Sequence, residues 1–281
     1  MIILNSFSNL LVYVIIRKAK ASDKKMVLEF CKTTFSWGDY IVEVWDYWIR
    51  EGNLLVLIEN NNPVAICHSS FFDKQVWVEG IRVNENFRKK GFAKRLVLKS
   101  ESIAKNKNCV ISKMLIETNN KKSLNLADYL NYKKEETWNF YSLIPKKSYK
   151  KPKVIVAINN NKIINFLLLN STYYVKSWRW ILLAKTNIDS LINEQRILYT
   201  IHDDKINALV IFTESEYFEK TLMLTLISDS VNGSNEIITY FQNYAIDKNI
   251  KRIQILTKIK TLPKIENLDK KFSFYLMKKE I

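Results

Sequence analysis

One stretch decides the fold of this chain: Val76-Trp-Val-Glu-Gly-Ile-Arg-Val-Asn-Glu-Asn-Phe-Arg-Lys-Lys-Gly-Phe-Ala-Lys-Arg-Leu96. Apolar residues alternate over Val76–Val83, which predicts a strand, and recur at helical spacing from about Gly91 to Lys105, which predicts an amphipathic helix. The pattern Arg88-x-x-Gly91-x-Ala93 spans the basic loop and the start of that helix. The first N–H groups of a helix lack internal acceptors and lie at the positive end of its dipole, so this loop is predicted to bind an anion.

Gly91 and the lysines around it favour a phosphate group as that anion. Glycine has no side chain to hold a ligand away from the backbone. Lys89, Lys90 and Lys94 add positive charge. The alternative interpretation is an ordinary surface loop with a run of charge. The short pattern alone does not exclude that alternative, whereas its place between a strand and a helix favours phosphate binding.

The rest of the first half alternates strands and helices. Further strands are predicted over Tyr13–Arg17, Leu54–Glu59, Val64–Phe72, Met114–Glu117 and Trp138–Leu143. Helices are predicted over Asp23–Thr33 with Ser22 as N-cap, around Trp45 and Trp48, and over Ser123–Leu130. Such alternation indicates an α/β domain built around one sheet.

The second half repeats this order more faintly. Strands are predicted over Val154–Ala157, Arg196–His202, Ile206–Thr213, Thr221–Ser228, Arg252–Thr257 and Phe272–Met277. Helical material is predicted up to about Asn193, over Glu236–Lys248 and near Pro263. Between the halves, Pro145–Lys153 is polar, basic and bounded by prolines, which is typical of a linker. We therefore expect two domains, residues 1–144 and 154–281, joined by residues 145–153.

Composition and charge limit the class of protein and its partners. Hydrophobic residues make up 47% of the 281, enough for real cores. A formal charge of +16 favours anionic partners, namely a nucleotide cofactor, nucleic acid or an acidic membrane surface. Three cysteines and two histidines lack the spacing of metal ligands, so we expect no metal and a reducing cytoplasm. Met1–Ile16 lacks a signal-peptide pattern and is too short to span a bilayer, so no membrane role is expected.

With these elements in order, the chain resembles the GNAT acetyltransferases, whose signature [Gln/Arg]-x-x-Gly-x-[Gly/Ala] follows the fourth strand. Arg88, Gly91 and Ala93 match that signature. The resemblance covers about residues 13–144. "VEGIRVNENFRKKGFAKRL" is especially similar to the subgroup that includes histidine N-acetyltransferase-like proteins, which carry a divergent second half. The resemblance implies an α/β (α+β mixed sheet) GNAT acyltransferase fold, here with a degenerate second GNAT-like domain.

The resemblance also implies where acetyl-CoA, the expected co-substrate, binds. Its pyrophosphate would be cradled by the backbone of Arg88, Lys89, Lys90, Gly91, Phe92, Ala93 and Lys94. Its pantetheine would lie as an added strand beside Ile81, Arg82 and Val83. Gly80 fits this arrangement, because a glycine inside a strand often marks a bulge. Asn120 resembles the family's asparagine near the pantetheine arm, and a helix N-cap is the alternative role for it.

Acetyl transfer to an amine requires a neutral nitrogen, so a base is expected near the thioester. α-Amines titrate near pH 8 and lysine near 10.4, which leaves most of either protonated at neutral pH. Glu79 lies on the same face of its strand as Trp77 and Ile81. We predict Glu79 as the base, directly or through water. The alternative is a structural carboxylate that pairs with Arg82 or a nearby backbone group.

The acid and the oxyanion contact are less well defined. Many GNAT enzymes carry a tyrosine four residues before a Gly-Phe pair. Here Asn131-Tyr132 stands at the pair, and Ala127 occupies the tyrosine position. Tyr129 is the predicted substitute, with Tyr132 as the alternative, and a packed aromatic without a catalytic role is the other interpretation of either residue. A backbone N–H near Ile81 or Arg82 is expected to stabilise the oxyanion.

The acceptor pocket is expected among aromatic residues between the first two helices. Trp37, Tyr40 and Trp45 fall where GNAT folds line that pocket, although part of this group is expected to be plain core. His68, in an alternating strand, is read as a core or edge histidine in preference to a base.

These observations predict an enzyme that moves the acetyl group of acetyl-CoA to a primary amine of a small molecule such as an amino acid. The alternatives are acetylation of peptide or protein N-termini and a non-catalytic acetyl-CoA- or nucleic-acid-binding protein on the same scaffold. Dispersed basic residues argue against nucleic acid. Whether the chain forms a homodimer is left open.

Overall fold

The computed structural model describes residues 13–32, 34, 39–158 and 161–281. They form two compact units. The first comprises Met1–Lys113 with Glu280–Ile281, and the second comprises Met114–Lys279. The chain passes from one to the other within β5 (Ile111–Glu117). Both are mixed α/β structures, as the sequence predicts.

The first unit is built on antiparallel strands with one parallel step at the end. β1 (Val14–Lys18), β2 (Leu54–Glu59), β3 (Asn62–Phe72) and β4 (Gln75–Val83) pair in that order. β4 then pairs in parallel with the first residues of β5. Every residue of β2 is buried, as expected for a central strand that is covered on both faces.

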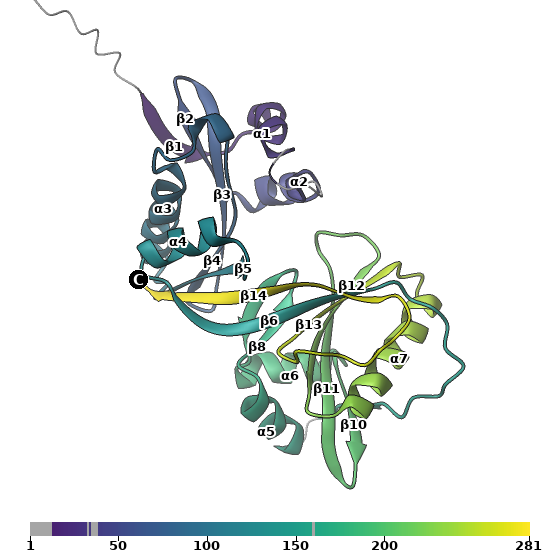
Figure 1. Cartoon of the computed structure of the whole chain (residues 1–281). Coiled ribbons are helices and arrows are strands. Elements are labelled where there is room, and N and C mark those ends of the chain that lie inside the picture. The colour runs from purple at the N-terminus through teal and green to yellow at the C-terminus, as the bar shows by residue number, and fades with distance from the viewer. Residues whose placement is uncertain (1–12, 33, 35–38, 159–160) are drawn as a thin grey trace, which may run out of the picture. The chain divides into compact units, whose positions relative to one another are not determined.

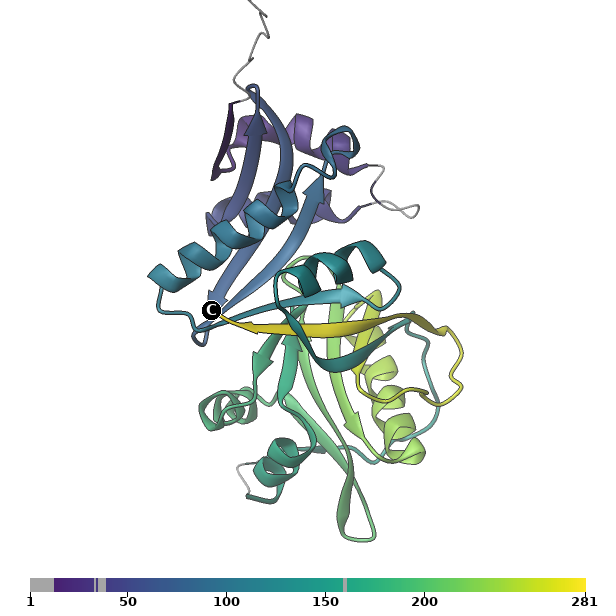
Figure 2. The same cartoon turned by 60° about the vertical axis from the view of Figure 1, so that its left-hand side comes forward.

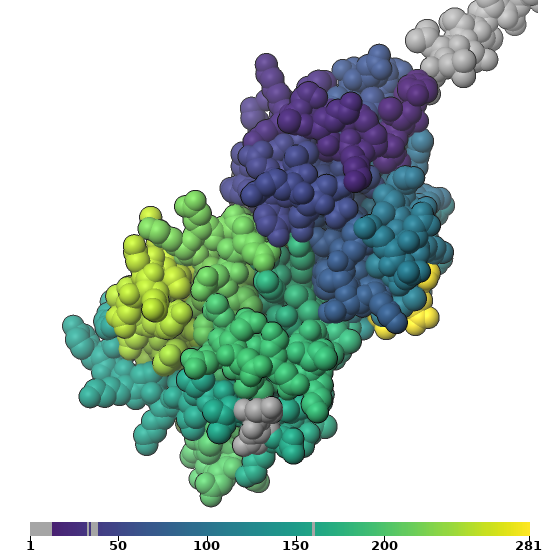
Figure 3. All heavy atoms as spheres, turned by 180° about the vertical axis from the view of Figure 1, so that it is seen from behind, coloured from purple at the N-terminus to yellow at the C-terminus, as the bar shows by residue number. Residues whose placement is uncertain are grey.

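Helices cover both faces of these strands. α1 (Lys24–Cys31) and α2 (Ile41–Glu51) lie on one face and α3 (Phe92–Asn106) on the other (Figures 1 and 2). In Figure 3 the same unit is seen from behind, with the purple and indigo spheres of the α1 and α2 region beside the teal-blue spheres of the α3 region. The inward stripe of α3 consists of Phe92, Leu96, Val97, Ser100, Glu101 and Ala104. The predicted amphipathic helix is therefore confirmed, together with the side on which it packs.

The start of α1 differs from the prediction of a helix capped by Ser22. A short 3₁₀ turn over Ala21–Asp23 precedes it, and the α-helix begins at Lys24. The Asp23 carboxylate accepts the N–H of Lys20 at 2.7 Å and both guanidinium nitrogens of Arg17 at 2.7 and 2.8 Å. These bonds tighten the turn, so Asp23 rather than Ser22 orders the entry into the helix.

The second unit is built on a larger sheet, whose strands range from two residues in β7 to 13 in β14. Its order is β14 (Leu268–Glu280), β6 (Lys133–Leu143), β13 (Arg252–Thr257), β12 (Thr221–Ser228), β11 (Lys205–Glu214), β10 (Ile197–His202) and β7 (Ile155–Val156). β12 and β13 are parallel, and the other neighbours in this series are antiparallel. The parallel pair is joined by a helical crossover, as parallel neighbours require.

Two hydrophobic cores lie on the two faces of this sheet. α7 (Val231–Asp247) packs on one face with Leu224 and Leu226. α5 (Asn161–Asn170) and α6 (Lys185–Asn193) contribute to the core of the other face, which includes Ile211 and Ile227. Residues of β11 and β12 alternate between the two cores, which is the period-2 pattern of a strand buried on both sides. α4 (Lys121–Tyr129) precedes β6.

Three predicted elements of the second half are corrected. The segment taken as helical up to Asn193 contains a hairpin, β8 (Tyr173–Lys176) and β9 (Arg179–Leu182), rich in β-branched and aromatic residues. α7 begins at Val231, five residues early, because the Ser230 hydroxyl caps it by accepting the N–H of Gly233 at 3.1 Å. Residues 258–267 form no helix. Side chains of β6 donate hydrogen bonds to carbonyl groups of this segment, as the Tyr141 hydroxyl does to the Lys260 carbonyl at 2.8 Å.

The boundary between the units lies elsewhere than the expected linker. Residues 145–153 contain no helix or strand, but they lie within the second unit. Lys147 of this segment pairs with Asp247 at the end of α7 at 2.6 Å. β6, assigned from sequence to the first domain, is inserted between β13 and β14. Long-range strand pairing therefore overrides the local linker composition. Within the described residues, no helix is both long and apolar enough to cross a membrane.

Candidate active site

The expected bulge in β4 is present and is centred on Gly80. On β3, Ile66 pairs with Arg82 and His68 pairs with Glu79, so Gly80 and Ile81 together face the single residue Cys67. Gly80 has a φ of +62°, a left-handed conformation that favours glycine. β4 pairs with β5 only over Gln75–Trp77. Past Trp77, no strand pairs with that side of β4 in the described part of the chain.

The loop after β4 delivers an uncapped helix N-terminus. The Asn84 side chain accepts the N–H of Asn86 at 3.1 Å and starts the 3₁₀ turn Glu85–Phe87. Gly91, with φ +76°, is the N-cap of α3 and has no side chain to satisfy the first amides. A Cβ at Gly91 would meet no atom within 4 Å. The space in front of α3 is therefore open, and the loop fits the predicted phosphate cradle.

The basic side chains of this loop are not equivalent. Lys90 lies 3.1 Å from both carboxylate oxygens of the buried Glu59 and 4.8 Å from the centre of the Phe87 ring. It therefore ties the loop to β2. Arg88 is exposed, and its Nε donates to the carbonyl of Val83 at 3.3 Å. Lys89 is exposed at a φ of +63°.

The predicted base, Glu79, is paired with a histidine. Its Oε1 lies 2.9 Å from Nδ1 of His68, and its side chain is 11% exposed. The alternative structural partner, Arg82, instead binds Asp39, at 2.6 Å through Nε and 3.0 Å through the second guanidinium nitrogen. The side chain of Arg82 is thus part of a buried ion pair, and only its backbone is available for the predicted cofactor contact.

His68 is fully buried, as expected for a core histidine, but it has charged neighbours. Its Nε2 lies 3.0 Å from Oε2 of Glu51, at the end of α2. The Trp48 ring stacks on the imidazole at 4.4 Å with an interplanar angle of 2°. The sequence reasoning missed Glu51 as a member of the site. The one sequence signal available is the His68–Glu79 register, which depends on placing the bulge at Gly80.

Two of the three predicted acceptor residues are described. Tyr40 packs edge-on against Trp48 with ring centres 6.1 Å apart, and burial raises the pKa of its hydroxyl to about 12. Trp45 is 1% exposed and belongs to the core. Trp37 lies outside the described residues. A cavity of about 270 Å³ lies beside α1 and α2, lined by Leu28, Cys31, Lys32, Asp39 and Val42.

Asn120 immediately precedes α4 and Tyr129 is its last residue, both in the second unit. The Asn120 side chain accepts the N–H of Ser123 at 3.1 Å and therefore acts as an N-cap, the alternative weighed from the sequence. Tyr129 is 66% exposed at the end of the helix. Tyr132 is buried. The predicted catalytic role of Tyr129 and the cofactor contact of Asn120 stay predictions.

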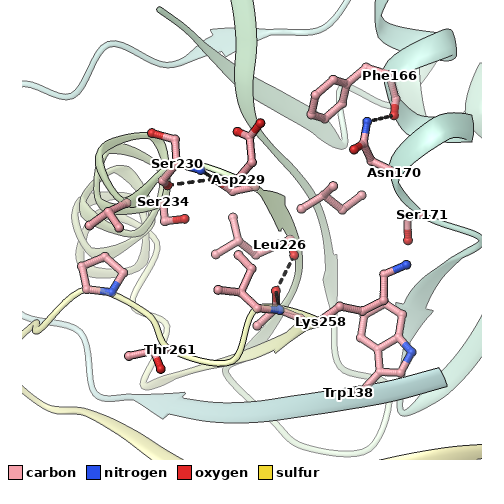
Figure 4. Close-up of a pocket in the computed structure, with 16 residues that line it drawn as sticks. Trp138, Phe166, Asn170, Ser171, Leu226, Asp229, Ser230, Ser234, Lys258 and Thr261 are labelled. Carbon is pink, nitrogen blue, oxygen red and sulfur yellow. Dashed lines mark hydrogen bonds between the residues drawn. The ribbon is translucent and has the colours of Figure 1, made fainter.

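The corresponding region of the second unit is arranged differently. β12 and β13 pair along their whole overlap to Leu226 and Thr257, and the Thr257 hydroxyl donates to the Leu226 carbonyl at 2.7 Å. A pocket of about 400 Å³ lies beside the start of α7. Figure 4 shows Asp229 and Ser230 at that start, with Trp138 of β6 across the pocket. A carboxylate and a filled cap make this helix end a poor phosphate site.

Comparisons with known proteins agree with this geometry. Residues 24–132 match the model of the acetyltransferase (GNAT) family. No curated protein sequence matches the chain. The whole chain is similar in fold to solved structures, including a proposed acetyltransferase from Thermoplasma acidophilum. That pair shares 16% identity with a TM-score of 0.61, covering 95% of this chain and 100% of the other.

Two further structures cover 95% of the chain at low identity. A GCN5-related N-acetyltransferase from Sphaerobacter thermophilus has a TM-score of 0.62 at 12% identity, with 95% of its own chain covered. A tandem GNAT protein from the clavulanic acid biosynthesis pathway has a TM-score of 0.54 at 9% identity, with 98% covered. At these identities the likeness concerns the fold, which extends over both halves of the chain.

Proposed function

We propose that the chain is an acyltransferase of the acetyltransferase (GNAT) family, whose members use acetyl-CoA, and that it acetylates a primary amine of a small molecule such as an amino acid. The observation that carries this proposal is the open N-terminus of α3 at Gly91, which no side chain caps. It follows β4, whose residues after Trp77 do not pair with β5. Such an end offers unpaired N–H groups and a positive dipole to a phosphate.

The cradle consists mainly of backbone. The N–H groups of Phe92 and Ala93 begin α3, where no carbonyl of the same helix can reach them. The exposed Arg88 and Lys89 supply charge, while Lys90 holds the loop in place through Glu59. The edge of β4 at Ile81, Arg82 and Val83 would bind the pantetheine amides as an added strand. Acetyl-CoA would supply an acetyl thioester to this edge.

Glu79 is proposed to remove the proton of the acceptor amine. Oε1 of its carboxylate lies at hydrogen-bond distance from Nδ1 of His68, and the carboxylate would accept the proton of the amine. The lone pair then available on nitrogen forms the new C–N bond as the C–S bond breaks. A backbone N–H near Ile81 or Arg82 would stabilise the oxyanion, and the sulfur leaves as the thiolate of coenzyme A.

A small acceptor is favoured by the cavity beside α1 and α2. Its volume of about 270 Å³ is below the roughly 300–1,000 Å³ of sites for drug-sized ligands. Asp39 lines it and is bound to Arg82, three residues along β4 from Glu79. An amino acid is proposed among small amines because the Val78–Leu96 stretch resembles histidine N-acetyltransferase-like proteins. Tyr40 is proposed to form part of the acceptor wall.

The test is a thiol-release assay with acetyl-CoA over amino acids, polyamines and peptides with N-terminal amines. The proposal expects turnover with at least one small amine, and a kcat/KM for it well above that for any peptide. A higher kcat/KM with peptides than with any small amine would show that peptide or protein N-termini are the acceptors. Acetyl-CoA binding without turnover on the whole panel would contradict the proposed activity.

A further inference from the structure

We propose that Glu51 and His68 are positioning residues, which with Glu79 form a carboxylate–imidazole–carboxylate chain around the buried His68 ring that orients the Glu79 carboxylate toward the acceptor. This inference rests on the proposed function, because it takes Glu79 as the base. Its members come from three elements: Glu51 from the end of α2, His68 from β3 and Glu79 from β4.

Each ring nitrogen of His68 lies close to one carboxylate oxygen. Nδ1 of His68 lies 2.9 Å from Glu79 and Nε2 lies 3.0 Å from Glu51. A carboxylate can only accept, so the ring must donate Nδ1–H to Glu79. The Nε2 contact is at ion-pair distance, but its direction does not meet hydrogen-bond geometry. The Glu51 side chain is 24% exposed.

The ring is held in one orientation by its packing. Trp48 stacks flat on it, and Trp48 lies one turn before Glu51 on α2. Only glycine at position 80 leaves room for the Trp48 ring, so the β4 bulge and the stack depend on each other. His68 itself is inaccessible to solvent. The imidazole therefore cannot rotate to exchange its two nitrogens, which suits a fixed donor to Glu79.

Other titratable groups near the chain add no competing charge. Burial raises the pKa values of the Cys67 thiol and the Tyr40 hydroxyl to about 12, so both are neutral at pH 7. Arg82 is already paired with Asp39. The two carboxylates in contact with the His68 ring are those of Glu51 and Glu79, one on each side. With Oε1 of Glu79 bound to the ring, rotation of the carboxylate is restricted.

Two isosteric substitutions separate this role from simple packing. The amide nitrogen of asparagine takes the place of Nδ1, whereas that of glutamine takes the place of Nε2. His68→Asn should keep the bond to Glu79 and stay within about fivefold of the wild-type kcat. His68→Gln should lose that bond and fall about 10²-fold in kcat, the typical cost of a misplaced catalytic group, with KM for acetyl-CoA unchanged.

Both variants lose the ring that stacks on Trp48, so a role of His68 in packing alone predicts equal losses of kcat in the two variants. Equal kcat values for the two, or a change confined to KM, would overturn the proposal. Glu51→Gln should lower kcat about tenfold, as loss of an outer partner does. The control is His202→Gln, since His202 is the other histidine and its side chain is 75% exposed. That variant should match the wild type.

A measurement without turnover tests the chain independently. With two histidines in the sequence, ¹H–¹⁵N spectra of histidine-labelled protein give assignable ring signals. A buried Nδ1–H bound to a carboxylate should give a slowly exchanging, far-downfield proton that moves upfield in Glu79→Gln. Its absence in the wild type would refute the positioning chain even if the enzyme turns over. Its presence without turnover on any amine would refute the proposed function and, with it, the catalytic purpose of the chain.

Discussion

The ring of Trp48 occupies the space that a side-chain carbon on Gly80 would need. Gly80 is the bulged residue of β4, and Trp48 is a fully buried residue of α2. This contact sets the distance between helix and strand, and it places Trp48 flat on the imidazole of His68. The packing of the first unit and the geometry around Glu79 are therefore determined by the same pair of residues.

Gly80→Ala should destabilise the protein by about 2–5 kcal/mol. The variant would combine a left-handed backbone, which costs roughly 1–3 kcal/mol outside glycine, with overpacking against Trp48, which costs about as much again. Gly52→Ala is the matched control. Its φ is +71°, but the nearest atom to its Cβ is the Lys18 ammonium at 3.9 Å. Urea unfolding should show a loss near 1 kcal/mol for the control, and similar losses in both variants would contradict the contact.

Gly91→Asp should abolish acetyl-CoA binding while the fold persists. The substitution would put a carboxylate into the open space in front of α3, against the phosphates. Isothermal titration calorimetry measures the affinity. Gly52→Asp provides the control, since it has the same backbone conformation and charge away from the cradle. Unchanged affinity in Gly91→Asp would remove the pyrophosphate from this loop.

Glu79→Gln should lower turnover at neutral pH by about 10²–10⁴, the usual value of a general base. The deficit should shrink as pH rises, because a growing fraction of the amine is then neutral without help. A pH–rate profile checks both statements, with Glu29→Gln, a substitution in an exposed pair with Lys32, as the control. A near-wild-type profile in Glu79→Gln would leave Glu79 with a structural role.

Asp39→Asn should cost about 3–5 kcal/mol of stability, because it leaves the buried Arg82 guanidinium without its carboxylate. The two side chains are 3% and 9% exposed, so water cannot replace the lost partner. Replacing both residues by apolar ones of similar size should recover most of the loss. Chemical denaturation measures the effect. A loss below about 1 kcal/mol, the range of exposed pairs, would show that water reaches the guanidinium.

Titration of the full chain should give one acetyl-CoA per polypeptide. The second unit keeps β12 and β13 paired to Thr257 and places Asp229 beside the start of α7. The paired strands leave no free edge for a pantetheine arm, and the carboxylate of Asp229 disfavours a pyrophosphate at this helix end. Calorimetry should therefore report a stoichiometry of one, which Gly91→Asp reduces to zero. A stoichiometry of two, or residual binding in that variant, would assign a site to the second unit.

Local patterns were sufficient to predict the elements that we propose to bind the cofactor. The alternation in β4, the basic loop and the stripe of α3 lie within about thirty consecutive residues, and each follows from its own neighbours. The bulge at Gly80 was also predictable, since glycine is rare in strands. Boundaries were less reliable where side chains compete with the backbone, as Asp23 does before α1 and Ser230 before α7.

The tertiary structure alone decided which residues meet. His68 is 11 residues from Glu79 and 17 from Glu51, and Asp39 is 43 residues from Arg82. The insertion of β6 between β13 and β14 is likewise a pairing across more than a hundred residues. Sequence periodicity reports which face of an element is buried, whereas the partner on that face depends on how distant elements pack. The fold class and the strand–loop–helix segment of β4 and α3 could therefore be predicted from the sequence, and the surroundings of Glu79 could not.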